Sequence, residues 1–314
     1  MALFPFAARR AVQLVPVLLG LTLIVFALQA FALGDPVRVA LGQRGDPETI
    51  ARLRTDYGLD APLWAQYGRF LTRLFRGDLG RSFRQQVPVT TLLAERLPAT
   101  ARLALAAMAL AACLGVAAGV TAAVWHGRFP DAAVMTLALL GISTPVFWLG
   151  MMLVLLFAVT LGWLPISGYG EGDWRHLVLP ALTLGALNTG YIARMTRGAL
   201  LEVLREDYLR TARAKGLRER VVLLKHGLRN AALPVLTLVG IGMGDLLVGA
   251  PLTETVFAWP GLGRLLVAAV ANRDLPVVLG ATLLFALIYV AATFLVDCCY
   301  VLADPRVRFG RGRQ

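Results

Sequence analysis

The chain has 314 residues, of which 58% are hydrophobic and only 16% are charged, and its mean hydropathy is +0.68. Soluble domains are about half apolar and about a quarter charged, so this composition excludes an ordinary soluble protein and predicts an integral membrane protein. The formal net charge of +12 arises from 31 basic and 19 acidic residues. In a membrane protein this excess is typical of cytoplasmic loops, and no aromatic and basic platform indicates nucleic-acid binding.

The first apolar segment covers residues 11–34, which contain no charged residue. About 20 apolar residues cross a bilayer as a helix, so we expect a first transmembrane helix within residues 1–34. Ala30-Phe31-Ala32 is also compatible with a signal-peptidase site. The apolar run is longer than a typical signal core, however, and a retained helix is favoured.

Residues 35–97 form the longest polar interval and are expected to make an external helical insertion. One short helix is predicted to start at Asp60-Ala61-Pro62. Apolar residues then recur at helical spacing, at Leu63, Tyr67, Phe70, Leu71 and Leu74. We expect this stripe to pack on the external face of the protein itself.

Five further apolar segments follow in the core region, residues 98–314. They cover residues 103–127, 132 to about 161, 176–193, about 231–256 and 275–296. The second of these is expected to be one long helix interrupted near Ser143-Thr144-Pro145, and Pro251 is expected to kink the end of the fourth. The predicted fold is therefore all-α, with six transmembrane helices and an external insertion between the first two.

Basic residues predict the orientation of these helices. The interval 194–229 holds ten of them, the C-terminal tail four and the N-terminus two. With six spans these regions share one side, which should be cytoplasmic, as should both termini. The interval 35–97 also holds ten arginines, but loops longer than about 60 residues do not follow this rule.

The sequence lacks the motifs of several chemistries. Its two lysines, Lys215 and Lys225, do not follow a glycine, so the phosphate-binding loop GxxxxGK[ST] is absent and ATP hydrolysis by that device is excluded. The three histidines lie in separate segments, and the three cysteines lie in apolar ones. We therefore expect no metal site, no disulfide framework, no cofactor and no catalytic cluster.

Polar residues within the apolar segments are a better signal of function, because charge in a membrane is costly. Asp245 lies in the fifth predicted span among glycines and should face protein or a water-filled cavity. Asn188 in the fourth span is a possible companion, and both are candidates for a translocation path. A hydrogen-bonded structural role for them stays open. Glu254 is expected near the water interface.

The cytoplasmic segment 202–230 is predicted to form two short amphipathic helices around a glycine corner. Leu201, Leu204, Tyr208 and Ala212 share one helical face. Gly216 can end that helix in the left-handed conformation. Leu217, Val221, Leu224 and Leu228 form the second apolar face. Interleaved acidic residues favour a protein groove over an anionic lipid surface as the partner of this segment.

The stretch DYLRTARAKGLRERVVLLKHGLRNAALP (207–234) resembles the cytoplasmic loop of permease subunits of bacterial ABC importers, in their dipeptide/oligopeptide branch. RTARAKG is similar to a variant of the EAA-type loop, with Arg210-Thr211-Ala212 in place of Glu-Ala-Ala. Leu233-Pro234 follows Gly216 at a greater distance than in the shorter sugar-importer form. The same branch is echoed in LRTDYGLDAPLWAQY (53–67), GDLGRSF (77–83), ERLPAT (95–100), ETVFAWPGLGRLL (254–266) and DPRVR (304–308).

The resemblance implies a non-catalytic permease with the ABC type I importer fold, in the bacterial inner membrane. Its implied partners are a second, homologous permease, two ABC ATPase subunits, an extracytoplasmic substrate-binding protein and membrane lipids. The implied substrates are dipeptides or oligopeptides, and nickel or glutathione importers stay open. A self-sufficient secondary transporter is less favoured, because neither inverted repeats nor paired intramembrane charges are evident.

The resemblance also assigns residues to roles. The implied ATPase-coupling residues are Asp207, Tyr208, Arg210, Thr211, Ala212, Arg213, Ala214, Lys215 and Gly216. An external loop facing the binding protein is expected at Phe257, Trp259, Pro260 and Gly261.

Overall fold

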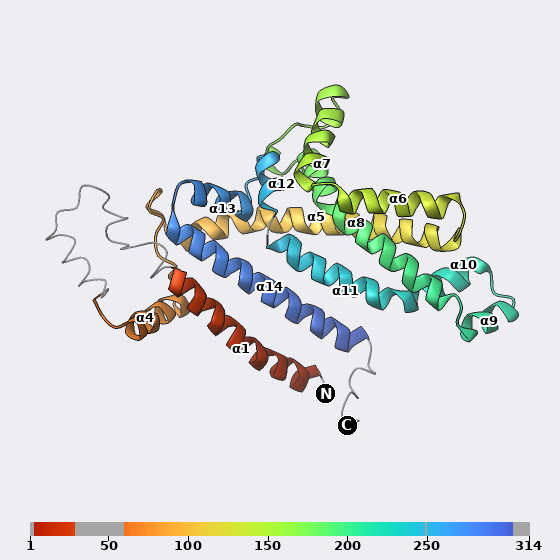
Figure 1. Ribbon diagram of the computed structural model, residues 1–314, viewed down its shortest axis with the longest axis horizontal. Coiled ribbons are helices and arrows are strands. Elements are labelled where there is room, and N and C mark those ends of the chain that lie inside the picture. Colours follow the sequence, from red (N-terminus) through yellow and green to blue (C-terminus); the bar gives the residue numbers. More distant parts are fainter. Residues whose placement is uncertain (1–2, 29–59, 249, 304–314) are drawn as a thin grey trace.

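The computed structural model describes residues 3–28, 60–248 and 250–303, and over these ranges the chain is mostly helical (Figure 1). The predicted all-α class is thereby confirmed. Within the described ranges the helices are α1 (Leu3–Ala27), α4 (Leu63–Phe75), α5 (Val89–Val124), α6 (Phe129–Ser143), α7 (Val146–Leu153), the π-helix η3 (Val154–Thr160), the 3₁₀-helix η4 (Gly170–Gly172), α8 (Arg175–Val203), α9 (Asp207–Ala214), α10 (Glu219–Val221), the π-helix η5 (Val222–Gly227), α11 (Leu228–Leu247), α12 (Pro251–Val256), α13 (Leu262–Ala271) and α14 (Leu275–Ala303).

Three described helices are long and apolar enough to cross a membrane. They are α5, the continuous helix from Glu219 to Leu247, and α14. A fourth is added if α6 and the helix formed by α7 and η3 are counted as one broken span. The apolar part of α1 is shorter, and α8 mixes polar and small residues into its sequence. The count of six spans therefore stays a prediction.

The interruption expected near Ser143-Thr144-Pro145 is present, but it is larger than a kink. α6 ends at Ser143, α7 begins at Val146, and the two axes differ by 108°. Thr144 has an extended backbone before Pro145. A residue that precedes proline disfavours the helical conformation, so the chain turns here instead of continuing as one long helix.

The boundary expected between the insertion and the core, at 97/98, falls inside a helix. α5 starts at Val89 and runs through Pro98 to Val124. Its first turns bury Leu92 and Leu93 in a cluster with residues of α13 and α14. This packing stabilises the helix on the N-terminal side of Pro98, which composition alone does not reveal.

The centre of the bundle is the close contact between α5 and α8, which pack more extensively than any other described pair. Glycines on both helices allow this approach. A Cβ atom at Gly185 would lie 2.8 Å from the carbonyl oxygen of Ala107, and one at Gly115 would lie 2.8 Å from Ile192. Small residues at such contacts let backbones approach closely, as is common between membrane helices.

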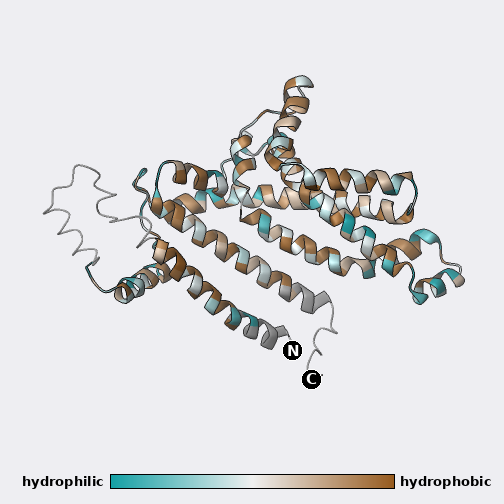
Figure 2. Cartoon of the chain, viewed as in Figure 1, coloured by the Kyte–Doolittle hydropathy of each residue, from teal (hydrophilic) through white to brown (hydrophobic). Residues whose placement is uncertain are grey.

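The two ends of the bundle differ in character. α9 and α10 form one end, at the right in Figure 1, whereas α4 and α13 lie at the other. Hydrophilic residues gather at α9 and α10, while α5 and α14 are mostly apolar (Figure 2). The first turn of α1 and the last turn of α14 point towards the lower right, the general direction of α9 (Figure 1).

The described part of the insertion packs back on the protein. The Tyr67 hydroxyl lies 2.9 Å from the Thr22 hydroxyl on α1, and the Tyr67 and Phe70 rings lie 5.4 Å and 5.9 Å from that of Phe26. Tyr67 and Phe70 of the apolar stripe therefore pack on α1, whereas Leu63 of the same stripe is exposed. Residues 35–59 of the insertion lie outside the described ranges.

Candidate functional site

The predicted coupling residues form a short, sharply terminated helix. α9 runs from Asp207 to Ala214, and Gly216 follows with a φ of +73°. The Gly216 N–H donates to the Arg213 carbonyl at 2.9 Å, and the Leu217 N–H donates to the Ala212 carbonyl at 3.4 Å. These two bonds with a left-handed glycine make a Schellman motif. The glycine corner expected from the sequence is present.

α9 is fixed to the bundle by its apolar side. Leu209 and Ala212 are buried together with Val222, and Val203 and Leu204 pack against them. The face expected from the sequence differs, because α8 ends at Val203 and a turn separates it from α9. One continuous helical face does not exist across that turn.

The second amphipathic face is also rotated relative to the expectation. Leu217, Val221 and Leu224 are exposed, whereas Val222 and Gly227 are buried. The π-helix η5 (Val222–Gly227) has a wider turn than an α-helix, which changes the register of the face. The predicted face assumed that the intervals of four, three and four residues between its leucines and valine belong to a regular α-helix.

The outer surface of α9 carries most of the predicted coupling residues. Of the nine, Ala212 is buried and the other eight are exposed. Arg213 forms a two-bond ion pair with Glu219 across the glycine corner, at 3.0 and 3.2 Å. Hydrogen bonding to this carboxylate raises the pKa of Arg213. The Tyr208 hydroxyl accepts a hydrogen bond from the Asn230 amide at 2.7 Å. This bond ties α9 to α11, in addition to the ion pair between Arg213 and Glu219.

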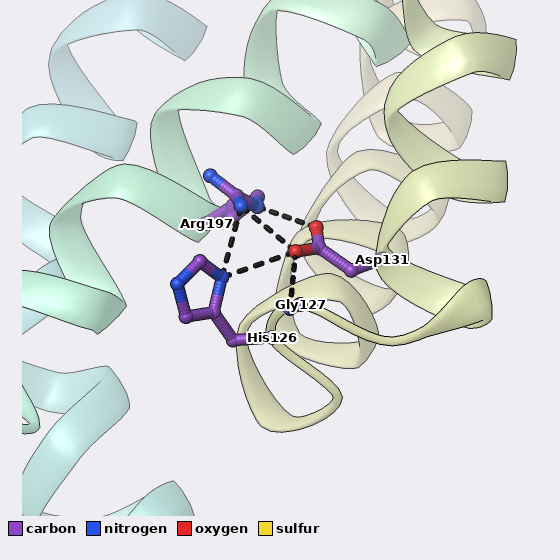
Figure 3. A network of polar contacts seen from close by, with 4 residues as sticks. All are labelled: His126, Gly127, Asp131 and Arg197. Atoms are coloured by element: carbon purple, nitrogen blue, oxygen red, sulfur yellow. Dashed lines mark hydrogen bonds and ion pairs between the residues drawn. The ribbon is translucent and has the colours of Figure 1, made fainter.

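A buried ion-pair network lies where the turn between α5 and α6 meets α8 (Figure 3). Arg197 of α8 donates to both carboxylate oxygens of Asp131, at 2.6 and 2.8 Å. The Gly127 N–H donates to the same carboxylate at 3.0 Å. His126 Nδ1 lies 3.1 Å from Asp131 and 3.0 Å from Arg197, and its tautomer decides which bond forms. Charge-assisted bidentate pairs of this kind fix geometry as well as adding energy.

Sequence reasoning missed this network. Arg197 counted only as one of the basic residues that predict orientation, and neither His126 nor Asp131 was expected to have a partner. The two partners of the ion pair stand 66 residues apart, so no local spacing connects them. One signal was available in the sequence: Asp131 follows Pro130 in the first turn of α6, where a helix favours an acidic residue.

Replacing Arg197 by methionine is expected to lower the stability of the protein. The change leaves the buried Asp131 carboxylate without its two-bond partner, which costs about 3 kcal/mol. Thermal unfolding in detergent measures the loss. The double variant Asp131→Leu and Arg197→Met should recover part of it, because no buried charge is left alone. Equal stability of wild type and Arg197→Met would contradict the role of the pair.

The opposite end of the bundle is organised around a buried carboxylate, that of Glu254 in α12. Its oxygens accept from the Thr100 hydroxyl at 2.8 Å and from the Arg264 N–H at 2.9 Å. Thr100 in turn accepts from the Leu262 N–H at 2.8 Å. The carboxylate therefore satisfies free N–H groups at the start of α13. Glu254 is fully buried within the protein at this end of the bundle, and its position near the water interface stays a prediction.

Glycines at the loop between α12 and α13 leave space for the Glu254 carboxylate. A Cβ atom at Gly261 would overlap the Glu254 carboxylate, and one at Gly263 would lie 2.9 Å from the Pro251 backbone. The Trp259 indole N–H donates to the Ala99 carbonyl at 2.9 Å. Contacts within the fold therefore account for the glutamate, the tryptophan and the two glycines of the segment ETVFAWPGLGRLL.

Phe257 and Trp259 were expected to face a binding protein, but both side chains are buried, as is Gly261. Trp259 packs edge-on against Tyr169 at 4.8 Å between ring centres. The large apolar area of the two aromatic rings is better buried inside the chain than in contact with water. Of the four residues predicted for the external loop, Pro260 is partly exposed and the other three are buried.

The two candidate path residues lie on the packed helices α8 and α11. Asn188 of α8 is partly buried, and its side-chain oxygen would be 2.6 Å from a Cβ atom at Gly242 of α11. Asp245 follows Gly242 by less than one turn and is exposed on this chain. Among the described residues no hydrogen bond links Asn188 with Asp245.

Comparison with known proteins decides the family. Residues 115–309 match the family model described as the binding-protein-dependent transport system inner membrane component. Residues 3–104 match the N-terminal model of the same kind of membrane component. The chain belongs to this family of transport permeases. It is therefore a multi-pass inner-membrane protein and an ABC importer permease, as the resemblance implied.

Curated relatives of this permease cover nearly its full length. It is 46% identical over 301 residues to the glutathione transport system permease protein GsiC of Pectobacterium atrosepticum, covering 96% of this chain and 98% of the relative. It is 47% identical over 307 residues to a putative peptide transport system permease protein of Brucella abortus, covering 96% and 98%. It is 45% identical over 333 residues to the di/tripeptide permease DppB of Pseudomonas aeruginosa, covering 98% and 99%.

A solved structure shares the fold of the permease. A chain of the inward-facing MetNI methionine ABC transporter superposes with a TM-score of 0.56 at 19% sequence identity. The match covers 68% of this chain and 96% of that chain. At this identity the likeness concerns the fold, which is that of an ABC type I importer permease.

Proposed function

We propose that this permease forms half of the translocation path of an ATP-driven importer of dipeptides, oligopeptides or glutathione. Its partner in the membrane is a second, homologous permease, and two ABC ATPase subunits hydrolyse ATP below them. An extracytoplasmic binding protein delivers the substrate from the other side. The named functions of its relatives, glutathione and peptide transport, support this substrate class.

The observation that carries the proposal is the form of α9. It is a short exposed helix at the hydrophilic end of the bundle, ended by Gly216 and attached to α8 through Leu209 and Ala212. A helix held in this way transmits a displacement of its outer face to the transmembrane helices. The outer face offers Asp207, Thr211 and Lys215 to an ATPase groove.

The proposed orientation places α9 and both termini in the cytoplasm. The end that carries α9 holds the segment 194–229 with its ten basic residues. Positively charged loops stay on the cytoplasmic side. The end that carries α4 and α13 then faces outward, where the binding protein docks on surfaces other than the buried Phe257 and Trp259.

Site-directed photocrosslinking tests the docking of α9. A benzophenone is attached to Thr211→Cys in a background without Cys113, Cys298 and Cys299, in the complete importer. We expect a crosslinked product with the ATPase subunit. Glu171→Cys, exposed at the opposite end, is the matched control and should give none. Failure of Thr211→Cys to react with the ATPase, or equal reaction at both positions, contradicts the proposal.

A further inference from the structure

Asp245 lies at the middle of the bundle along the direction of its helices. The glycines that precede it contact the central residues of three other helices. Gly242 meets Asn188 and Met108, and Gly244 meets Tyr289. Tyr289 stands 14 residues from each end of α14 (289 − 275 and 303 − 289). Asn188 stands 13 and 15 residues from the ends of α8 (188 − 175 and 203 − 188).

The side of α11 that carries Asp245 is not covered by the other helices that the structure describes. Pro234, Ile241 and Asp245 follow one another at intervals of seven and four, which places them on one helical face, and all three are exposed. Successive residues turn by about 100° on a helix. Asp245 therefore lies between Gly242, which packs on α8, and Gly244, which packs on α14.

A charged side chain at this depth is costly in lipid and marks an ion or substrate pathway by default. Among the described residues Asp245 takes part in no ion pair. It also lies in the last turn of α11, which ends at Leu247. The carbonyl groups of that helix end add to its negative potential and favour a cation.

Two uncharged polar side chains lie on the helices at either side of Asp245. Asn188, beside Gly242, is partly exposed on α8, and Tyr289, beside Gly244, is 44% exposed on α14. An amide and a phenol both donate and accept hydrogen bonds. A peptide offers one ammonium group together with carbonyl groups nearby, so this combination suits a peptide better than a bare metal cation.

We propose that Asp245 binds the amino-terminal ammonium group of the substrate in the translocation path, with Asn188 and Tyr289 beside it. This inference rests on the proposed function. It assigns a recognition step to the permease itself, separate from the selection made by a binding protein. The substrates it favours are peptides with a free α-amino group, including glutathione.

The test compares uptake of two probes, labelled alanyl-alanine and its N-acetyl derivative, by the complete importer in proteoliposomes. Asp245→Asn should reduce the preference for the free amine about tenfold, as expected for the loss of one charge-assisted hydrogen bond. Asp245→Glu should retain it. Because every variant uses the same binding protein, a change in the ratio reports on the permease. Glu171→Gln, which removes an exposed carboxylate elsewhere, should leave the ratio unchanged.

Three results would overturn the inference, and they differ from one another. An unchanged ratio in Asp245→Asn, with wild-type uptake intact, removes the role of Asp245 alone. Loss of co-purification with the second permease in Asp245→Asn shows that the carboxylate pairs with a cation of that subunit instead. Absence of ATP-dependent uptake of either probe by the wild type removes the proposed function, and the inference with it.

Discussion

Replacing Glu254 by alanine is expected to destabilise the permease by about 3–5 kcal/mol, because a buried hydrogen-bonded group is lost and a cavity is left. The Thr100 hydroxyl and the Arg264 N–H both lose their acceptor. The start of α13 then has unsatisfied N–H groups in a site without water access. The measurement is the thermal midpoint of unfolding in detergent, supported by the yield of folded protein from membranes.

Two variants make this prediction specific. Glu254→Gln keeps one acceptor oxygen and should lose less stability than Glu254→Ala. Glu171→Ala removes a carboxylate that is exposed on the same end of the protein, and its unfolding midpoint should equal that of the wild type. If Glu254→Ala unfolds at the wild-type temperature, the carboxylate does not organise this end of the bundle.

Replacing Gly216 by valine is expected to separate ATP hydrolysis from uptake. Gly216 has a φ of +73°, and a Cβ atom added there would meet nothing within 4 Å, so the obstacle is backbone strain. That strain is about 1–2 kcal/mol for a side chain in the left-handed region. When the backbone relaxes to relieve this strain, the orientation of α9 changes. ATP-dependent uptake should therefore fall about tenfold or more. Uptake is measured in proteoliposomes beside ATPase activity.

Gly198→Val is the matched control for this change. Gly198 is also exposed, and a Cβ atom there also meets nothing within 4 Å, but its backbone is helical within α8. The same added side chain should therefore leave uptake close to wild type. Both variants should insert into the membrane at wild-type levels. Wild-type uptake by Gly216→Val would remove the coupling role of the corner.

Sequence reasoning succeeded where the signal was local. Gly216 follows an amphipathic run and precedes Leu217, and this short-range pattern predicts a helix end that the structure contains. The apolar stripe of α4 and the break before Pro145 are also local features. The resemblance of the segment 207–234 added the family, which the comparisons confirm.

Sequence reasoning failed where the two partners of a contact are distant in the chain. Thr100 and Glu254 stand 154 residues apart, and Asp131 and Arg197 stand 66 apart. Burial of these charges depends on a tertiary arrangement that hydropathy along the chain does not encode. The resemblance assigned Phe257 and Trp259 to an external loop, and nothing along the chain indicated that their aromatic rings fill space within the fold.

The prediction of the apolar face of the second cytoplasmic helix was wrong for a different reason. Periodicity assumed 3.6 residues per turn, whereas η5 (Val222–Gly227) is a π-helix. Its wider turn buries Val222 and Gly227 against α8, where Leu200 would be 3.2 Å from a Cβ atom at Gly227. A regular pattern cannot reveal a local change of helix type.

Reconstituted uptake tests the central claim most directly. Proteoliposomes contain this permease, the second permease, the ATPase subunits and the binding protein, and accumulation of labelled alanyl-alanine and glutathione is followed with and without ATP. The account predicts accumulation that requires ATP and stops when this chain is omitted. Accumulation by this chain alone, without ATP and without its partners, would contradict it.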